Sequence, residues 1–89
     1  MSKTKTIKAL QTLAQSTPPS ICRAKVYGIA AKIERLSRMT IAEALSHGHS
    51  SADGALREAS YLVDAGAATQ VARPGYHGTY NFLDGSTLS

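Results

Sequence analysis

The chain lacks a second cysteine, so Cys22 cannot form an internal disulfide bond. A single cysteine is typical of proteins that stay in a reducing cytoplasm, and we expect that location here. Long apolar runs are missing as well: none approaches the ~20 residues of a membrane-spanning helix. The first residues also lack the apolar core of a signal peptide. We therefore expect a cytoplasmic protein with no membrane partner.

The motifs of common enzyme classes are missing too. The sequence has neither of the usual glycine-rich phosphate loops, and none of its serines sits in the strand-turn-helix elbow of a hydrolase. Its 89 residues form one domain with a small core, which leaves little room for a catalytic pocket. We expect no enzyme activity, no catalytic residue and no cofactor.

The three histidines invite comparison with a zinc site. His47 and His49 lie two residues apart, and His77 lies far along the chain. Zinc takes three or four ligands in tetrahedral geometry, and no Cys or His pair here has finger-like spacing. Cys22 falls on the apolar stripe of an expected helix, where cysteine behaves as a small buried hydrophobe. We expect no metal site, His47 and His49 as polar turn residues, and Cys22 in the core.

Acidic residues are scarce in the first half of the chain. Residues 1–38 hold eight Lys and Arg against Glu34 alone, 8 − 1 = +7, whereas residues 39–89 hold two Arg against five acidic residues, 2 − 5 = −3, which gives the total of +4. A half-chain this positive can lie along a polyanion. The alternative is a solubilising surface.

Apolar spacing predicts two helices in this basic half. Ser2–Gln15 has a narrow apolar stripe and stops at Ser16–Pro19, because a residue before proline is pushed toward extended geometry. Ser20 can cap a longer helix, Ile21–Ser37. The two stripes comprise Ile7, Leu10, Leu13 and Ala14, and then Cys22, Val26, Ile29, Ile33 and Leu36.

Three small residues, Ala24, Gly28 and Ala31, lie on the far side of the longer helix. A glycine inside a helix costs about 1 kcal/mol relative to alanine, which suggests a packing reason. That reason would be a dimer contact or the first helix folded over Gly28. The alternative is a tolerated glycine.

Two further helices are predicted after Met39. Thr40 and Glu43 match a capping box before a helix at Ile41–His47, and Gly48 ends it. Ser50 or Ser51 can cap the next helix, with Asp53 in its first turn where a negative charge suits the helix dipole. Gly66 follows the last apolar turn, as is common where helices end. The core side of this helix comprises Ala55, Leu56, Ala59, Leu62 and Val63.

The pattern then changes to short runs of β-forming residues. Ala68–Ala72 and Thr79–Leu83 are separated by Arg73–Gly78, which contains Pro-Gly and a second glycine. This is the chemistry of a hairpin turn. We therefore expect a two-stranded hairpin, followed by a frayed tail.

A helix, a turn, a helix and a two-stranded hairpin, in this order, resemble the winged helix-turn-helix superfamily of DNA-binding domains. The residues that carry the resemblance are Thr40–Leu45, Tyr61–Gly66 and Arg73–Phe82. It implies a mostly α fold with a small β-hairpin, a winged helix-turn-helix with an extra N-terminal helix. The expected parts are an N-terminal helix and Pro-Pro linker at 1–19, the winged domain at 20–84 and a tail at 85–89.

The place of the family's first helix has two solutions. We prefer Ile21–Ser37, because Arg38-Met39 then forms the short link to the motif. The alternative makes the N-terminal helix the first and the next one an insertion.

The resemblance implies that the motif's second helix enters the major groove of double-stranded DNA while the wing contacts the minor groove or backbone. Arg57 can make a bidentate contact with guanine, and Glu58 can accept from cytosine or restrain Arg57. The implied contact residues are Lys25, Lys32, Arg35 and Arg38 in the preceding helix, Ser50, Ser51, Asp53, Gly54, Arg57, Glu58 and Tyr61 in the motif, and Arg73, Tyr76 and His77 in the wing.

The expected recognition helix holds only one arginine, opposed by Asp53 and Glu58. If one chain neutralises about four phosphates, the salt slope is roughly −3.6, so a homodimer is expected to supply enough contacts. This leads to a small, sequence-specific or semi-specific transcriptional regulator. The alternative keeps the fold as a protein-binding adaptor or inhibitor of the kind found in phages and mobile elements. Its interface anchors would be Tyr61, Tyr76 and His77.

Overall fold

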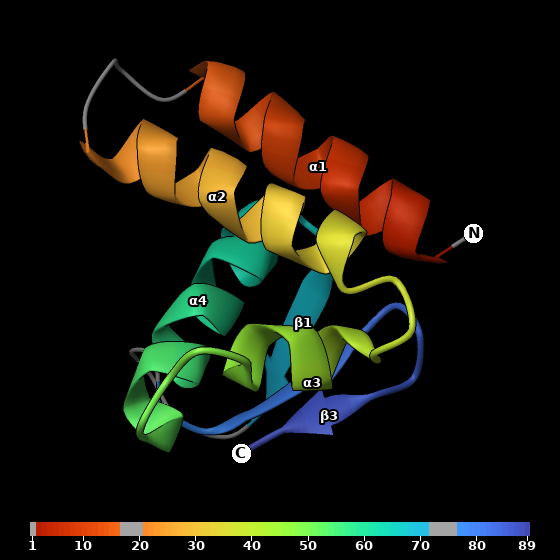
Figure 1. The fold of residues 1–89 in the computed structure, drawn as a ribbon, viewed down its shortest axis with the longest axis vertical. Helices are drawn as coiled ribbons and strands as arrows, with labels where there is room; N and C mark the ends of the chain where they lie inside the picture. Colours follow the sequence, from red (N-terminus) through yellow and green to blue (C-terminus); the bar gives the residue numbers. More distant parts are fainter. Residues whose placement is uncertain (1, 17–20, 72–76) are drawn as a thin grey trace.

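Figure 1 shows a computed structural model of the chain, which describes residues 2–16, 21–71 and 77–89. These residues are mostly helical and carry a small antiparallel sheet of strand order β1-β2-β3. No helix in the described part of the chain has the length and apolarity to cross a membrane. The elements are α1 (Ser2–Ser16), α2 (Ile21–Arg35), α3 (Ile41–Ser46), α4 (Ala52–Asp64), β1 (Ala68–Val71), β2 (Thr79–Phe82) and β3 (Thr87–Leu88).

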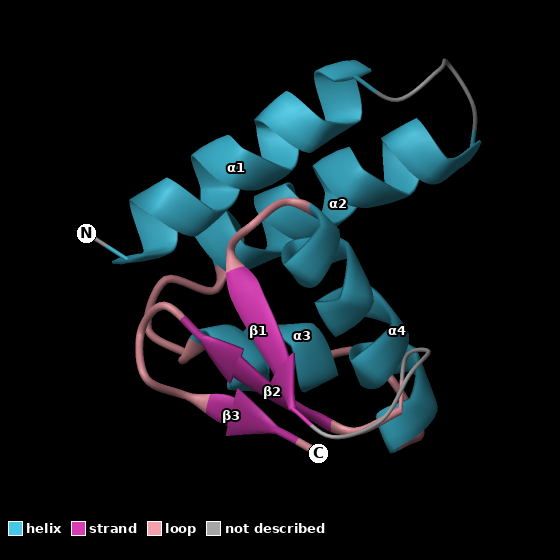
Figure 2. Cartoon of the chain, turned by 180° about the vertical axis from the view of Figure 1, so that it is seen from behind, coloured by secondary structure: helices cyan, strands magenta, loops and turns pink. Residues whose placement is uncertain are grey.

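Helices α1 and α2 lie side by side as one layer, over a second layer made of α3, α4 and the sheet (Figures 1 and 2). Leu10 and Ala14 of α1 are fully buried, so the predicted narrow stripe docks on the rest of the same chain. Arg23 Nε donates to the Ala14 carbonyl at 3.0 Å, which places a cation at the C-terminal end of α1, where the helix dipole favours it.

The predicted stripe of α2 is confirmed at Val26, Ile29 and Ile33, which are all buried. Cys22 is exposed, so the prediction of a buried cysteine was wrong. Cys22 is in the first turn of α2, one turn before Val26. The buried part of the stripe begins only at Val26, so Cys22 stays outside the core. A side chain added at Gly28 would meet nothing within 4 Å, so α1 does not cover this glycine.

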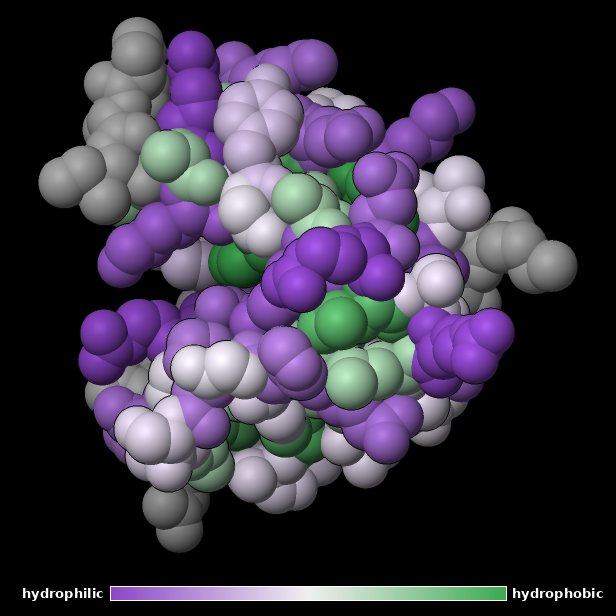
Figure 3. All heavy atoms as spheres, viewed as in Figure 1, coloured by the Kyte–Doolittle hydropathy of each residue, from purple (hydrophilic) through white to green (hydrophobic). Residues whose placement is uncertain are grey.

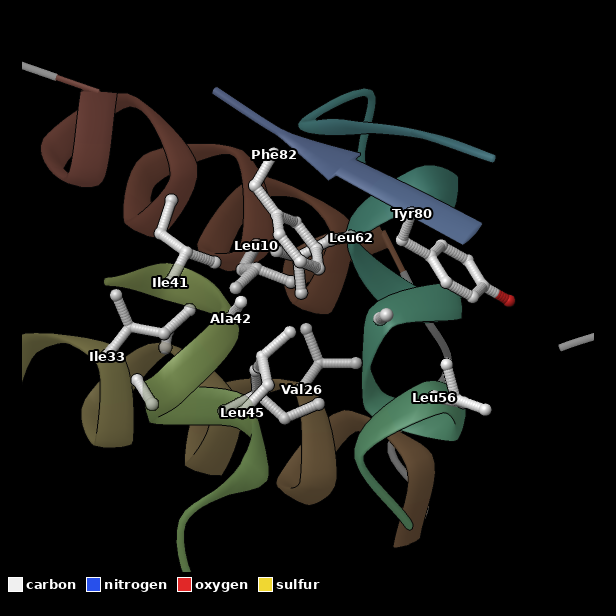
Figure 4. Close-up of a cluster of buried hydrophobic side chains, with 14 of the residues drawn as sticks. Leu10, Val26, Ile33, Ile41, Ala42, Leu45, Leu56, Leu62, Tyr80 and Phe82 are labelled. Atoms are coloured by element: carbon white, nitrogen blue, oxygen red, sulfur yellow. The ribbon is translucent and has the colours of Figure 1, made fainter. Parts of the chain in front are cut away.

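The core joins both layers. Figure 4 shows side chains from the four helices and from β2 pointing toward one another. Burying one large apolar side chain contributes about 1.5–3 kcal/mol, so this cluster is the main source of stability. Tyr80 is also fully buried, and its hydroxyl has no hydrogen-bond partner among the described residues. The largest of the buried side chains are Tyr80, Leu10, Ile33, Ile41, Leu45, Leu62 and Val26.

Both predicted signals at the ends of α3 and α4 are confirmed. Thr40 and Glu43 form the capping box, with Glu43 N–H donating to Thr40 Oγ1 at 3.1 Å and Thr40 N–H to Glu43 Oε1 at 2.9 Å. Gly66, at φ 77°, ends α4 in the left-handed conformation that glycine adopts without strain. The N–H of Ala67 then bonds to the Leu62 carbonyl at 2.8 Å, which closes the last turn.

The predicted hairpin is present, with β1 and β2 paired from Ala68↔Phe82 to Val71↔Thr79. Ala72, the last residue of the first predicted strand, lies outside the described residues. The predicted second strand extends one residue too far, because Leu83 already belongs to the following turn.

The expectation of a frayed tail after Asp84 was wrong. Thr87–Leu88 forms β3, which pairs with β2 through Tyr80↔Leu88 and Asn81↔Thr87. The turn before β3 caps α3, because Ile41 N–H donates to Asp84 Oδ2 at 2.8 Å and Ala42 N–H to Ser86 Oγ at 3.2 Å. A strand of two residues shows no alternation in the sequence, so only its tertiary contacts reveal it.

These contacts predict an acid-sensitive contribution from Asp84. Burial raises the pKa of this carboxyl, but hydrogen bonds from the Ser86 side chain and the Ile41 N–H outweigh burial and lower it overall. A group with a lowered folded-state pKa contributes stability that is present above the unfolded pKa of about 3.9 and is lost as the pH falls through the folded value.

We therefore expect Asp84→Ala to lower the free energy of unfolding by about 1 kcal/mol at neutral pH, the usual effect of losing a helix cap. Urea unfolding should show this difference shrinking as the solution is acidified. Asp64→Asn is the control, because it removes the same charge from an exposed position. A difference for Asp84→Ala that stays constant down to strongly acidic pH would contradict the assignment.

Candidate functional site

The N-terminal end of helix α4 lies at the surface of the molecule. Its core face is buried, whereas Arg57 and Asp53 on the opposite face keep 57% and 50% of their side chains exposed. β1 packs against α4 and runs back along it, so the end of the hairpin where β1 stops at Val71 and β2 begins at Thr79 lies at the same end of the molecule as the α4 N-terminus (Figures 1 and 2). Val71, which ends β1, is 48% exposed there.

The start of α4 differs from the start of α3. Ser51 takes the N-cap position with extended backbone, φ −141°, but within the described ranges its hydroxyl makes no capping hydrogen bond. Ser50 beside it is exposed. The first N–H groups of α4 therefore lack the side-chain cap that α3 receives, and the two hydroxyls are available to an anionic ligand.

Lys32 is held inside the fold. Its Nζ donates to Glu58 Oε1 at 2.8 Å, to the His47 carbonyl at 3.1 Å and to the Leu45 carbonyl at 3.2 Å. Only 14% of the side chain is exposed. The ammonium thus joins α2 to the C-terminal end of α3 and to α4, which removes Lys32 from the set of cations that can reach a ligand.

Glu58 and Gly54 are turned toward the α3–α4 connection. His49 Nε2 lies 2.8 Å from the second carboxylate oxygen of Glu58. The same imidazole covers Gly54, where a Cβ atom would come within 2.4 Å of His49 Nδ1. Glu58 and Gly54 were expected to face outward, but in the structure both contact the His49 side chain. This Lys32–Glu58–His49 network escaped sequence analysis, because its members come from three separate elements.

Arg57 is the cation on the outer face of α4. Its Nη2 lies 3.6 Å from Asp53 Oδ2, four residues earlier on the helix. An exposed helix pair of this kind contributes only about 0.3–0.5 kcal/mol, so the contact with Asp53 holds Arg57 only weakly.

Tyr61 lies on the side of α4 that meets α2. Burial and then a hydrogen bond with the Cys22 thiol raise the pKa of its hydroxyl. Because the ring is partly buried against the core, Tyr61 offers little surface to DNA or to a protein partner.

The other three basic residues that were predicted to contact DNA from the region of α2 fall into two groups. Lys25 is exposed and lies seven residues before Lys32, nearly two helical turns, so it shares the side of α2 that faces α4. Arg35 ends α2 and Arg38 follows shortly after; both are exposed, at the side of the molecule away from the α4 N-terminus (Figure 1).

The predicted wing residues are only partly described. His77 is exposed, and its carbonyl accepts from Gln70 Nε2 at 2.6 Å. Arg73 and Tyr76 lie outside the described residues, so their expected roles stay predictions.

Comparisons with family models, with curated proteins and with solved structures found no match to the chain. Among the residues that the structure describes, no group of three His, Cys, Asp or Glu side chains is arranged to hold a metal ion. What the site does must therefore be inferred from the chain's own residues.

The close contact between Gly54 and His49 predicts an unusual mutational cycle. Gly54→Ala should normally stabilise a helix by about 1 kcal/mol. Here the new methyl group would displace the His49 ring and break its bond with Glu58, so we expect the single variant to gain nothing or to lose stability. In a His49→Ala background the same change should recover the gain of about 1 kcal/mol. Urea unfolding of the four variants measures this, and an equal gain in both backgrounds would contradict the contact.

Proposed function

We propose that the chain binds double-stranded DNA as a winged helix-turn-helix domain, with α2 to α4 as its three helices and the β1–β2 hairpin as its wing. The observation that carries the proposal is the common position of the α4 N-terminus and the end of the hairpin at Val71 and Thr79. A helix presented in this way can enter the major groove while the hairpin follows the neighbouring backbone. α1 is then an addition to the domain, packed on α2 and contributing to its core.

Each proposed contact matches a chemical group on DNA. The hydroxyls of Ser50 and Ser51 and the first N–H groups of α4 suit a phosphate, which fixes the position of the helix. Arg57 suits the O6 and N7 atoms of guanine, and Lys25 suits a phosphate on the flank. His77, with Arg73 and Tyr76 still as expectations, supplies the contacts of the wing.

Fewer residues are placed to contact DNA than the sequence predicted. Lys32 is occupied within the fold, Gly54 and Tyr61 are covered, and Arg35 and Arg38 lie at another side. With about three cations per chain, the expected salt slope is roughly −2.7, which corresponds to weak binding by one chain. We therefore propose that the protein acts as a dimeric transcriptional regulator, since two chains double the contacts.

The proposal predicts a different effect for two arginines of equal charge. The affinity for a random-sequence duplex can be measured by fluorescence anisotropy at two salt concentrations. We expect the Arg57→Ala variant to bind several-fold more weakly than the wild type. Arg38→Ala removes the same charge from the other side of the molecule and should leave the affinity unchanged within about twofold. With a duplex selected for tight binding, the loss for Arg57→Ala should grow to about 1–3 kcal/mol if the residue contacts a base.

Two results would overturn the proposal. One is the absence of binding to duplex DNA at low salt. The other is an equal loss for both arginine variants, which would show that overall charge, rather than the α4 end, is responsible.

A further inference from the structure

A second surface lies away from the α4 N-terminus, between the end of α2, helix α3 and strand β3. We call it the α3–β3 face, and we define it by Leu36, Met39, Ala42 and Leu88, with Arg35 and Arg38 at its edge. A hollow of about 440 Å³ lies between α3 and β3, and a second of about 300 Å³ adjoins it toward Arg35 and Arg38. Met39 lines both hollows, so the surface is continuous.

Apolar side chains form part of this face, beside the polar Glu43, Ser46, His47 and Thr87 that also line the hollow, and its edge toward α2 is basic. Leu36, Met39 and Leu88 pack on the core yet remain partly exposed. Figure 3 shows apolar side chains gathered where the end of α2 meets α3, with hydrophilic side chains around them. Lys3 Nζ donates to the Ser37 carbonyl, which brings a third cation to this edge. An apolar surface with a rim of one charge is a feature of interaction sites.

A second copy of the chain is a poor occupant. A two-fold dimer through this face would bring Arg35 and Arg38 of both copies into one interface, because both copies use the same patch. A head-to-tail contact would need an acidic patch elsewhere on the chain. Of the six acidic residues, Glu58 and Asp84 are held by hydrogen bonds within the fold, and Asp53 lies beside Arg57 on the surface. Glu43, the acidic residue on the hollow itself, is held by the Thr40 N–H.

Duplex DNA also fits this face less well than the α4 end does. The rim could pair with phosphates, but a phosphate backbone offers nothing to fill an apolar hollow between α3 and β3. The combination requires a ligand that carries both apolar side chains and negative charge.

We propose that the α3–β3 face binds a short amphipathic helix of a partner protein, with aliphatic side chains in the hollow beside Met39 and carboxylates paired with Arg35 and Arg38. Helix-in-groove recognition of this kind uses apolar anchors at positions i, i+3, i+4 and i+7. The site is separate from the proposed DNA contacts, so one chain can hold DNA at the α4 end and the partner at the other side.

The test uses a synthetic helical peptide with leucine at those four positions and glutamate between them. A matched peptide carries lysine in place of each glutamate. We expect the glutamate peptide, titrated into the ¹⁵N-labelled full chain, to shift backbone amide signals at residues 35–43 and 87–88. The double variant Arg35→Glu, Arg38→Glu should weaken its binding by at least about tenfold, because rim charges steer and hold a charged partner. Arg57→Glu should not weaken it, which separates this site from the proposed DNA contacts.

Several outcomes would overturn the proposal. These are no binding of the glutamate peptide at millimolar concentration, equal binding of the lysine peptide, or shifts located on α4. Shifts of the same residues on raising the protein concentration alone would assign the face to a second copy. Shifts there with a DNA duplex would assign it to DNA. The amide spectrum of the double-arginine variant serves as the folding control, because both residues are exposed.

Discussion

The Lys32 ammonium is the point on which the arrangement of the helices depends. It donates to two carbonyls at the C-terminal end of α3 and to the Glu58 carboxylate of α4, while its own backbone belongs to α2. A cation at the C-terminal end of a helix is favoured by the helix dipole, and a carboxylate beside it balances the buried charge. One side chain therefore links three helices that also share the apolar core.

This constraint matters because α3 is short. A helix of 6 residues is unstable alone, so its ends must be held by tertiary contacts. The N-terminal end is held by the capping box and by Asp84 and Ser86, and the C-terminal end by Lys32. Since α4 follows α3 through the turn that contains His49, fixing α3 also fixes the direction in which α4 projects. The proposed DNA contacts begin after the C-terminal end of α3, whereas the α3–β3 face extends from α3 toward β3 and the end of α2.

The sequence predicted the elements whose signals are local. The stripes of α1 and α2, the capping box at Thr40 and the glycine at 66 depend on residues within a turn or two of each other, and all three are present in the structure. β3 and the exposure of Cys22 were missed, because they depend on which segments meet in space. The charge count overestimated the number of cations that can reach DNA for the same reason. Lys32 adds to the positive half of the sequence, but its charge is paired with Glu58 within the fold.

The candidate site was predictable only in outline. The sequence indicated that Arg57 faces outward and that Ser50 or Ser51 caps α4, but no local pattern shows that Glu58 turns back to Lys32 and His49. The spacing of residues along a helix predicts which of them share a face. It does not predict which other segment of the chain packs on that face, because tertiary packing determines this.

The most direct test of the central claim is a double-mutant cycle between Lys32→Met and Glu58→Gln, measured by urea unfolding. Because the two side chains are only 14% and 20% exposed, each single change should cost about 2–4 kcal/mol by removing the charge partner of a largely buried ion, although Lys32 keeps its two carbonyls and Glu58 keeps His49. The double variant should cost clearly less than the sum, with a coupling of about 1–3 kcal/mol. Additive changes, or single variants as stable as the wild type, would contradict the account.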